Sequence, residues 1–138
     1  MILVDTNVLI DLVQDDPQWA DWSEDQLIKA QKQGALFINA IVYAELVPAL
    51  DSIAALDDFL KLSKITVKDI SRPAAYMAGE AFLKYRKRKG TKTGVLADFF
   101  VGAQAHTEGW KILTRDQGRY KTYFPKVKLI CPLVGKAI

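Results

Sequence analysis

Four acidic residues stand where proteins often place side chains that do chemistry. Asp5 ends the first hydrophobic run of the chain, and Asp116 follows another short apolar run. Glu45 and Asp98 each lie among apolar residues, on segments that we expect to be helical. In open α/β sheets, ligands bind outside the carboxyl ends of the strands. An acid that directly follows a strand is therefore well placed to act on a substrate.

A divalent cation is the simplest partner for such a group of acids. Carboxylates that converge cannot all stay ionised unaided, because like charges at close range raise one another's pKa. Mg²⁺ and Mn²⁺ prefer oxygen ligands and often bridge to substrate phosphates. Such an ion can activate a water and neutralise charge on a phosphodiester under attack. The chain has a single histidine, His106, which we expect to pack within a helix or lie on its surface.

Each acid also has a structural alternative. Asp5 could cap the helix that follows it, and Asp116 could be a turn residue before Gly118. Glu45 could lie on a solvated helix face. Asp98, which has apolar neighbours on both sides, either stabilises the first turn of a helix or is half buried. A half-buried carboxylate without a partner is costly, so this acid is the hardest to explain structurally.

Strand and helix patterns alternate along the chain and position these acids. We predict strands at 1–4, 36–38, 65–67, 111–114 and 127–130, and helices at 6–12, 17–33, from 40, from 51 or 52, at 73–89 and at 96–108. Strands separated by helices require crossover connections, so we predict one α/β domain over residues 1–138, with a mainly parallel sheet covered by helices on both faces. If the first and fourth strands are neighbours, Asp5 and Asp116 face one crevice.

The charge of the chain is small but unevenly distributed. The formal net charge is +3 over 138 residues, about one domain in length. A basic stretch precedes Asp98 and contains Lys84, Arg86, Lys87, Arg88, Lys89 and Lys92. This stretch suits a polyanion such as RNA, although it could also be a solvated helix end. No apolar run reaches membrane-spanning length and no signal-peptide pattern opens the chain, so we expect a cytoplasmic protein.

Several motifs together resemble one known family. The opening Val4-Asp5-Thr6-Asn7-Val8-Leu9-Ile10-Asp11 resembles the first motif of the PIN-domain ribonucleases, specifically the VapC toxins of bacterial toxin–antitoxin pairs. Ala44-Glu45-Leu46 matches their second acidic motif. Residues 96–103, 113–116 and 119–125 are similar to the carboxy-terminal half of one VapC-like subgroup. The resemblance covers nearly the whole chain, with the motifs in order.

This resemblance carries expectations about fold and function. It implies a Rossmann-like PIN domain, an endoribonuclease that depends on Mg²⁺ or Mn²⁺, a cognate VapB-like antitoxin that covers the active site, and a homodimer. The implied acidic quartet is Asp5, Glu45, Asp98 and Asp116, with Thr6, Asn7 and Thr114 as polar support. We expect Asp5 and Asp98 to bind the metal directly, and Glu45 and Asp116 to bind through water or at a second site. The expected contacts to RNA are Arg86, Lys87, Arg88, Lys92 and Arg115.

Other classes of function stay open at this point. One is a catalytically silent α/β domain that binds RNA or a protein, in which Asp5 and Asp116 serve only as cap and turn. Another is a PIN domain with a housekeeping role in RNA processing. A receiver-like or phosphatase-like domain has less support, because the chain lacks the expected order of aspartate and lysine after its strands. Metal-dependent cleavage of RNA separates the first class from the toxin.

Overall fold

The core of the protein is a five-stranded sheet. The computed structural model describes residues 1–88, 90–91 and 95–132. The strands are β1 (Ile2–Val4), β2 (Leu36–Ile38), β3 (Ile65–Val67), β4 (Lys111–Leu113) and β5 (Leu129–Ile130). They lie in the order β3-β2-β1-β4-β5, and every neighbouring pair is parallel. The predicted parallel α/β sheet is confirmed, and β1 and β4 are indeed neighbours.

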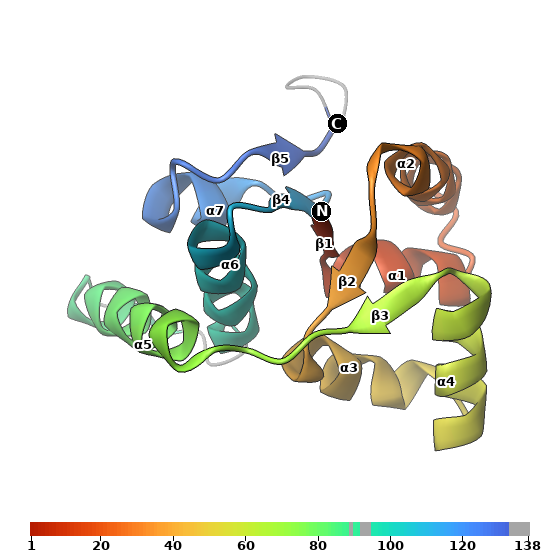
Figure 1. Cartoon of the computed structure of the whole chain (residues 1–138), viewed down its shortest axis with the longest axis horizontal. Coiled ribbons are helices and arrows are strands. Elements are labelled where there is room, and N and C mark those ends of the chain that lie inside the picture. The colour runs from red at the N-terminus through yellow and green to blue at the C-terminus, as the bar shows by residue number, and fades with distance from the viewer. Residues whose placement is uncertain (89, 92–94, 133–138) are drawn as a thin grey trace.

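Helices cover both faces of this sheet. They are α1 (Thr6–Val13), α2 (Ala20–Gln33), α3 (Ala40–Leu46), the short 3₁₀ helix η1 (Val47–Ala49), α4 (Ile53–Leu62), α5 (Arg72–Lys87), α6 (Leu96–Glu108) and α7 (Gly118–Tyr123). Figure 1 shows α1 and α2 on one side of the strands and α5 and α6 on the other. All three residues of β1 are buried, as expected for a central parallel strand covered on both faces.

The helix starts follow from local capping. The side chain of Asn39 accepts hydrogen bonds from the backbone N–H groups of Ile41 and Val42, both at 3.0 Å. Ser52 and Ser71 cap α4 and α5 in the same manner. These side chains satisfy N–H groups that have no partner within the helix. The predicted starts at these three positions are confirmed.

Some predicted boundaries were wrong. The second helix begins at Ala20 rather than Pro17, because Asp16 accepts from the N–H groups of Gln18 and Trp19 and closes a separate turn first. The fifth helix ends at Lys87, and its predicted last residue, Lys89, lies outside the described residues. The last strand is shorter than predicted. Both η1 and α7 were not predicted.

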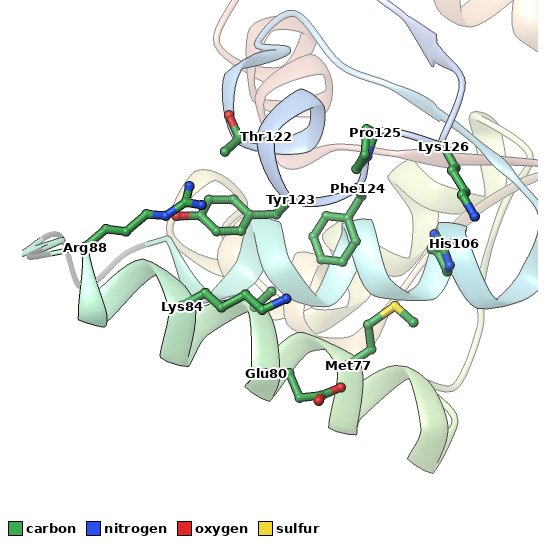
Figure 2. A pocket seen from close by; sticks show the side chains of 11 residues that line it. Met77, Glu80, Lys84, Arg88, His106, Thr122, Tyr123, Phe124, Pro125 and Lys126 are labelled. Carbon is green, nitrogen blue, oxygen red and sulfur yellow. The ribbon is translucent and has the colours of Figure 1, made fainter.

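Helices α5 and α6 lie side by side, and α7 packs on α6. A pocket opens between α5, the last turn of α6, the end of α7 and the segment that follows α7 (Figure 2). In the described part of the chain, no helix is both long and apolar enough to cross a membrane.

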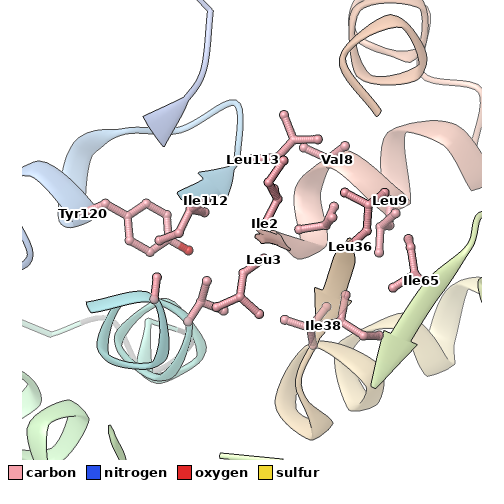
Figure 3. Close-up of a cluster of buried hydrophobic side chains, with 14 of the residues drawn as sticks. Ile2, Leu3, Val8, Leu9, Leu36, Ile38, Ile65, Ile112, Leu113 and Tyr120 are labelled. Atoms are coloured by element: carbon pink, nitrogen blue, oxygen red, sulfur yellow. The ribbon is translucent and has the colours of Figure 1, made fainter. Parts of the chain in front are cut away.

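Buried aliphatic side chains from the strands and from α1 form the centre of the core (Figure 3). On the α6 side, Phe99 is fully buried and its ring meets that of Tyr123 edge-on, with 5.1 Å between the ring centroids. Phe124 packs so closely on Gly102 that a Cβ at this glycine would lie 2.3 Å from the ring. The aromatic cluster therefore fixes α7 against α6 at Phe99, the residue that directly follows Asp98.

Candidate active site

The register of β1 and β4 brings two residues of the site together. Val4 pairs with Leu113, and the backbone N–H of Asp5 donates to the carbonyl of Leu113 at 2.9 Å. The next residues, Asp5 and Thr114, therefore meet at the carboxyl edge of the sheet. There the hydroxyl of Thr114 donates to Oδ2 of Asp5 at 2.9 Å.

Asp5 is a buried carboxylate held by three donors. Besides Thr114, the hydroxyl of Tyr120 donates to Oδ2 and the backbone N–H of Thr6 donates to Oδ1, both at 2.8 Å. Burial raises the pKa of Asp5, and these hydrogen bonds oppose that rise. The bond from Thr6 also makes Asp5 the cap of α1. The structural alternative for Asp5 is thus correct, but it accounts for only one of its two oxygens.

Asp98 lies in the first turn of α6 and is half buried. Nη1 of Arg119 lies 3.2 Å from Oδ2 of Asp98 and forms an ion pair with it. The pKa of Asp98 is nevertheless raised to about 7, chiefly by burial and then by the negative charges of the other three acids, while the charge of Arg119 opposes the rise. Each of those acids is therefore close enough to act on Asp98 electrostatically. The quartet that the sequence predicts is gathered in one place.

Glu45 and Asp116 are the exposed acids of this group. The hydroxyl of Thr6 donates to Oε1 of Glu45 at 2.6 Å. Oδ1 of Asp116 accepts from the backbone N–H of Gly118 at 3.0 Å, so Asp116 also serves as the turn residue of its structural alternative. In each of these acids, one carboxylate oxygen accepts a hydrogen bond that holds the side chain in place.

The three predicted supporting residues all contact the acids or one another. Thr6 and Thr114 donate to the acids as described above. Nδ2 of Asn7 donates to the hydroxyl of Thr114 at 3.3 Å, and Oδ1 of Asn7 accepts from the backbone N–H of Arg115 at 3.3 Å. These contacts link α1 to the loop after β4. The functional role of the three residues stays a prediction.

Two residues of the site were missed by sequence reasoning, and both lie on α7. Tyr120 is buried, and burial together with the charge of Asp5 raises its pKa, so its hydroxyl stays protonated and donates to Asp5. Arg119 balances the charge of Asp98, its guanidinium lies 5.9 Å from the ring centre of Tyr85, and its buried Nε has no hydrogen-bond partner among the described residues. The sequence signals for them were the run of basic and aromatic residues after Asp116 and the resemblance over residues 119–125, but neither assigned them a role.

The residues predicted to contact RNA differ in their exposure and in their partners. Arg86, Lys87 and Arg88 are exposed at the end of α5, and Lys92 lies outside the described residues. Arg115 has a structural partner instead, because its guanidinium forms two hydrogen bonds to the buried Asp11, at 2.9 and 3.1 Å. This pairing gives Arg115 a structural role, and its role as an RNA contact stays a prediction. A guanidinium in a forked pair with a buried carboxylate holds the loop after β4 against α1.

The donor set suits a hard divalent cation. Within the described ranges, no three side chains of His, Cys, Asp or Glu lie close enough together to hold a metal ion as they stand. Mg²⁺, however, is usually bound through only one or two protein carboxylates, with waters and substrate phosphate completing its shell. Burial raises the pKa values of both Asp5 and Asp98, and the charges of nearby acids add to the rise, Glu45 for Asp5 and the other three acids for Asp98. A cation there would remove that conflict.

Comparisons with known proteins agree with this fold. The chain is 29% identical over 114 residues to Ribonuclease VapC10 of Mycobacterium tuberculosis, which covers 83% of this chain and 81% of the relative. The fold matches a chain of VapBC2 from Rickettsia felis, solved bound to a DNA fragment from its promoter, with a TM-score of 0.71 and 21% identity over 96% of this chain and all of that one. VapBC-1 from nontypeable Haemophilus influenzae matches with a TM-score of 0.69 and 16% identity, covering 95% and 98% of the two chains. The sequence model of the PIN domain matches residues 2–125, so the chain belongs to the PIN domain family.

Proposed function

We propose that this protein is a metal-dependent endoribonuclease that cleaves RNA phosphodiester bonds and acts as the toxin of a toxin–antitoxin pair. The observation that carries the proposal is the convergence of Asp5, Glu45 and Asp116 on Asp98 at the carboxyl ends of β1 and β4. The name of the relative Ribonuclease VapC10 supports the reaction class.

In this proposal Asp5 and Asp98 would hold Mg²⁺ or Mn²⁺, and Glu45 and Asp116 would support its binding. When bound, the ion activates water for attack on the phosphodiester and neutralises charge on the phosphate. The chain's own residues prepare the site for it. Tyr120 and Thr114 fix the orientation of the Asp5 carboxylate by donating to one of its oxygens. Arg119, next to Asp98, supplies positive charge where a phosphate would approach.

We also propose two protein partners. A VapB-like antitoxin would cover the acidic crevice, as the names of the VapBC structures that share this fold suggest. A second copy of this chain is the other partner. Tyr76 and Leu83 on α5 are 73% and 60% exposed, and apolar surface of this kind favours a homodimer.

Cleavage of RNA by the purified chain tests the proposal. We expect cleavage in Mg²⁺ or Mn²⁺, none in EDTA, and loss of at least a hundredfold in rate for Asp98→Asn, because a neutral amide is a poor ligand for a hard cation. Asp58→Asn is a matched control, since Asp58 is an exposed acid on α4. Cleavage that persists equally in EDTA or in Asp98→Asn would exclude this site.

Growth after induction of the chain alone tests the toxin role. We expect wild type to arrest growth, Asp98→Asn to relieve the arrest, and co-expression of the antitoxin to relieve it for wild type. Equal arrest by wild type and by a folded Asp98→Asn protein would favour a silent domain that sequesters RNA or a protein.

A further inference from the structure

A second feature on the α5 and α6 side of the molecule has the chemistry of a ligand site. It is the pocket between α5, the last turn of α6, the end of α7 and the segment after α7, with a volume of about 350 Å³ (Figure 2). None of the four acids of the crevice lines it. We call it the α5–α7 pocket.

The α5–α7 pocket combines a positive rim with apolar walls. Lys84, Arg88 and Lys126 provide three cations, all exposed, against the single acid Glu80. The walls include Met77 and His106, together with the aromatic and proline side chains of Tyr123, Phe124 and Pro125. Cations track the backbone of a single-stranded nucleic acid, and aromatic or apolar surface suits its bases. The volume lies at the small end of the range for ligand pockets, about 300–1,000 Å³, and fits a single nucleotide.

Helix geometry divides the basic stretch into two faces. Lys84 and Arg88 are four residues apart, so they lie on the same face of α5, and both line the pocket. Arg86 and Lys87 do not line it. The guanidinium of Arg86 lies over the ring of Phe82, 5.8 Å from its centre, whereas that of Arg88 lies over the ring of Tyr123 in the pocket wall, 5.7 Å from its centre. Only part of the basic stretch is therefore directed at this pocket.

Helices α6 and α7 both run from the acidic site to the pocket. On α6, Asp98 is in the first turn and His106 in the last, a separation of about 12 Å at 1.5 Å per residue. On α7, Arg119 and Tyr120 contact the acids, while Thr122 and Tyr123 line the pocket. A strand of a few nucleotides can span this distance, so one RNA molecule can occupy both places.

We propose that the α5–α7 pocket binds a nucleotide of the single-stranded RNA substrate beside the bond that is cut. Lys84 and Arg88 contact its phosphates, Lys126 closes the rim, and the base lies against the apolar walls. The inference rests on the proposed function in taking RNA as the substrate. It adds a site that would select RNA with unpaired nucleotides next to the cleaved bond.

Two double variants with the same change in charge test the pocket. We compare Lys84→Gln/Arg88→Gln with the control Arg86→Gln/Lys87→Gln, using fluorescence anisotropy of a labelled single-stranded RNA of mixed sequence. EDTA is present throughout, and the salt concentration is varied. All four side chains are exposed, so both variants should fold. Each lost phosphate contact lowers the slope of log K against log salt by about 0.7.

We expect the pocket variant to lose about 1.4 in slope and to bind about tenfold more weakly at 0.1 M salt, since two phosphate contacts are removed. The control should change less than half as much. Equal losses in both variants would mean that α5 attracts RNA diffusely, and no loss in the pocket variant would remove RNA from this face; either result overturns the proposal.

Photocrosslinking locates the RNA independently. An RNA that carries 4-thiouridine should crosslink to the peptide containing Tyr123 in the wild type, and less in the pocket variant than in the control. Crosslinks confined to other peptides would also overturn the proposal. Because both measurements are made in EDTA, they do not depend on cleavage. Binding at the pocket by a chain that cuts no RNA would refute the proposed ribonuclease, whereas metal-dependent cleavage without pocket binding would refute only this inference.

Discussion

Asp98 should destabilise the metal-free protein when it is ionised. The pKa of its carboxyl rises from an ordinary 3.8 to about 7, chiefly because the group is buried. Each unit of pKa difference corresponds to about 1.4 kcal/mol, so the ionised form costs about 4 kcal/mol before solvent screening is considered. The side chain is 30% exposed, and screening lowers this cost. We expect ionisation of Asp98 to lower the free energy of unfolding by about 2 kcal/mol, to within a factor of two.

The sign of the pH dependence follows from the direction of the shift. Since the folded state holds the proton more tightly than the unfolded state, the penalty is complete above about pH 7, shrinks as the pH falls, and disappears only below the ordinary pKa of 3.8. The Asn side chain of Asp98→Asn is neutral like the protonated acid, so the variant does not lose this stability at high pH. In EDTA at pH 8 the variant should therefore unfold at a temperature about 6–8 °C above wild type, at about 3–4 °C per kcal/mol for a domain of this size. At pH 5 the difference should be smaller, and it should vanish only as the pH falls below the ordinary pKa of 3.8.

Thermal unfolding of wild type, Asp98→Asn and the control Asp58→Asn, each in EDTA and in Mg²⁺ at both pH values, checks this reasoning. Mg²⁺ at pH 8 should raise the unfolding temperature of wild type and of the control, and leave Asp98→Asn nearly unchanged. The reasoning is refuted if Asp98→Asn is less stable than wild type by the same amount at pH 8 and pH 5. In that case Asp98 stabilises the fold through its ion pair with Arg119.

Three further substitutions test contacts that position the site. Tyr120→Phe removes one of the three donors to the buried Asp5 and should cost about 1–3 kcal/mol in urea unfolding, and an unchanged midpoint would contradict this. Arg115→Gln leaves the buried Asp11 without its cationic partner, with only the hydroxyl of Ser23 donating to it, and should cost about 3–5 kcal/mol, with recovery on adding Asp11→Asn. If Arg115→Gln instead weakens RNA binding at unchanged stability, Arg115 is a substrate contact. Asn39→Ala removes the cap of α3 and should cost about 1–2 kcal/mol in the same assay, whereas a neutral effect would mean that water replaces the cap.

Much of the fold is predictable because its signals are local. A short apolar run followed by a capping residue marks both the end of a strand and the start of a helix, as at Val4-Asp5 and at Ile38-Asn39. Alternation of such units implies crossovers and a parallel sheet. The helix α7 was missed because it spans only Gly118–Tyr123 and has no side-chain cap at its start. Its position depends on aromatic packing against Phe99 and Gly102, which are distant in sequence.

The sequence by itself determined the parallel sheet and the ends of the elements that carry the four acids, because strand ends and helix starts are set by neighbouring residues. Only the tertiary structure decided which side chains complete the site. Tyr120 reaches Asp5, and Arg119 reaches Asp98, because α7 packs on α6 beside the carboxyl end of β1. Packing likewise separated the basic residues, since Arg115 is paired with the buried Asp11 while Lys84 and Arg88 line a pocket. Charge and residue type are written in the sequence, but the partner of each charge depends on distances that only the folded chain defines.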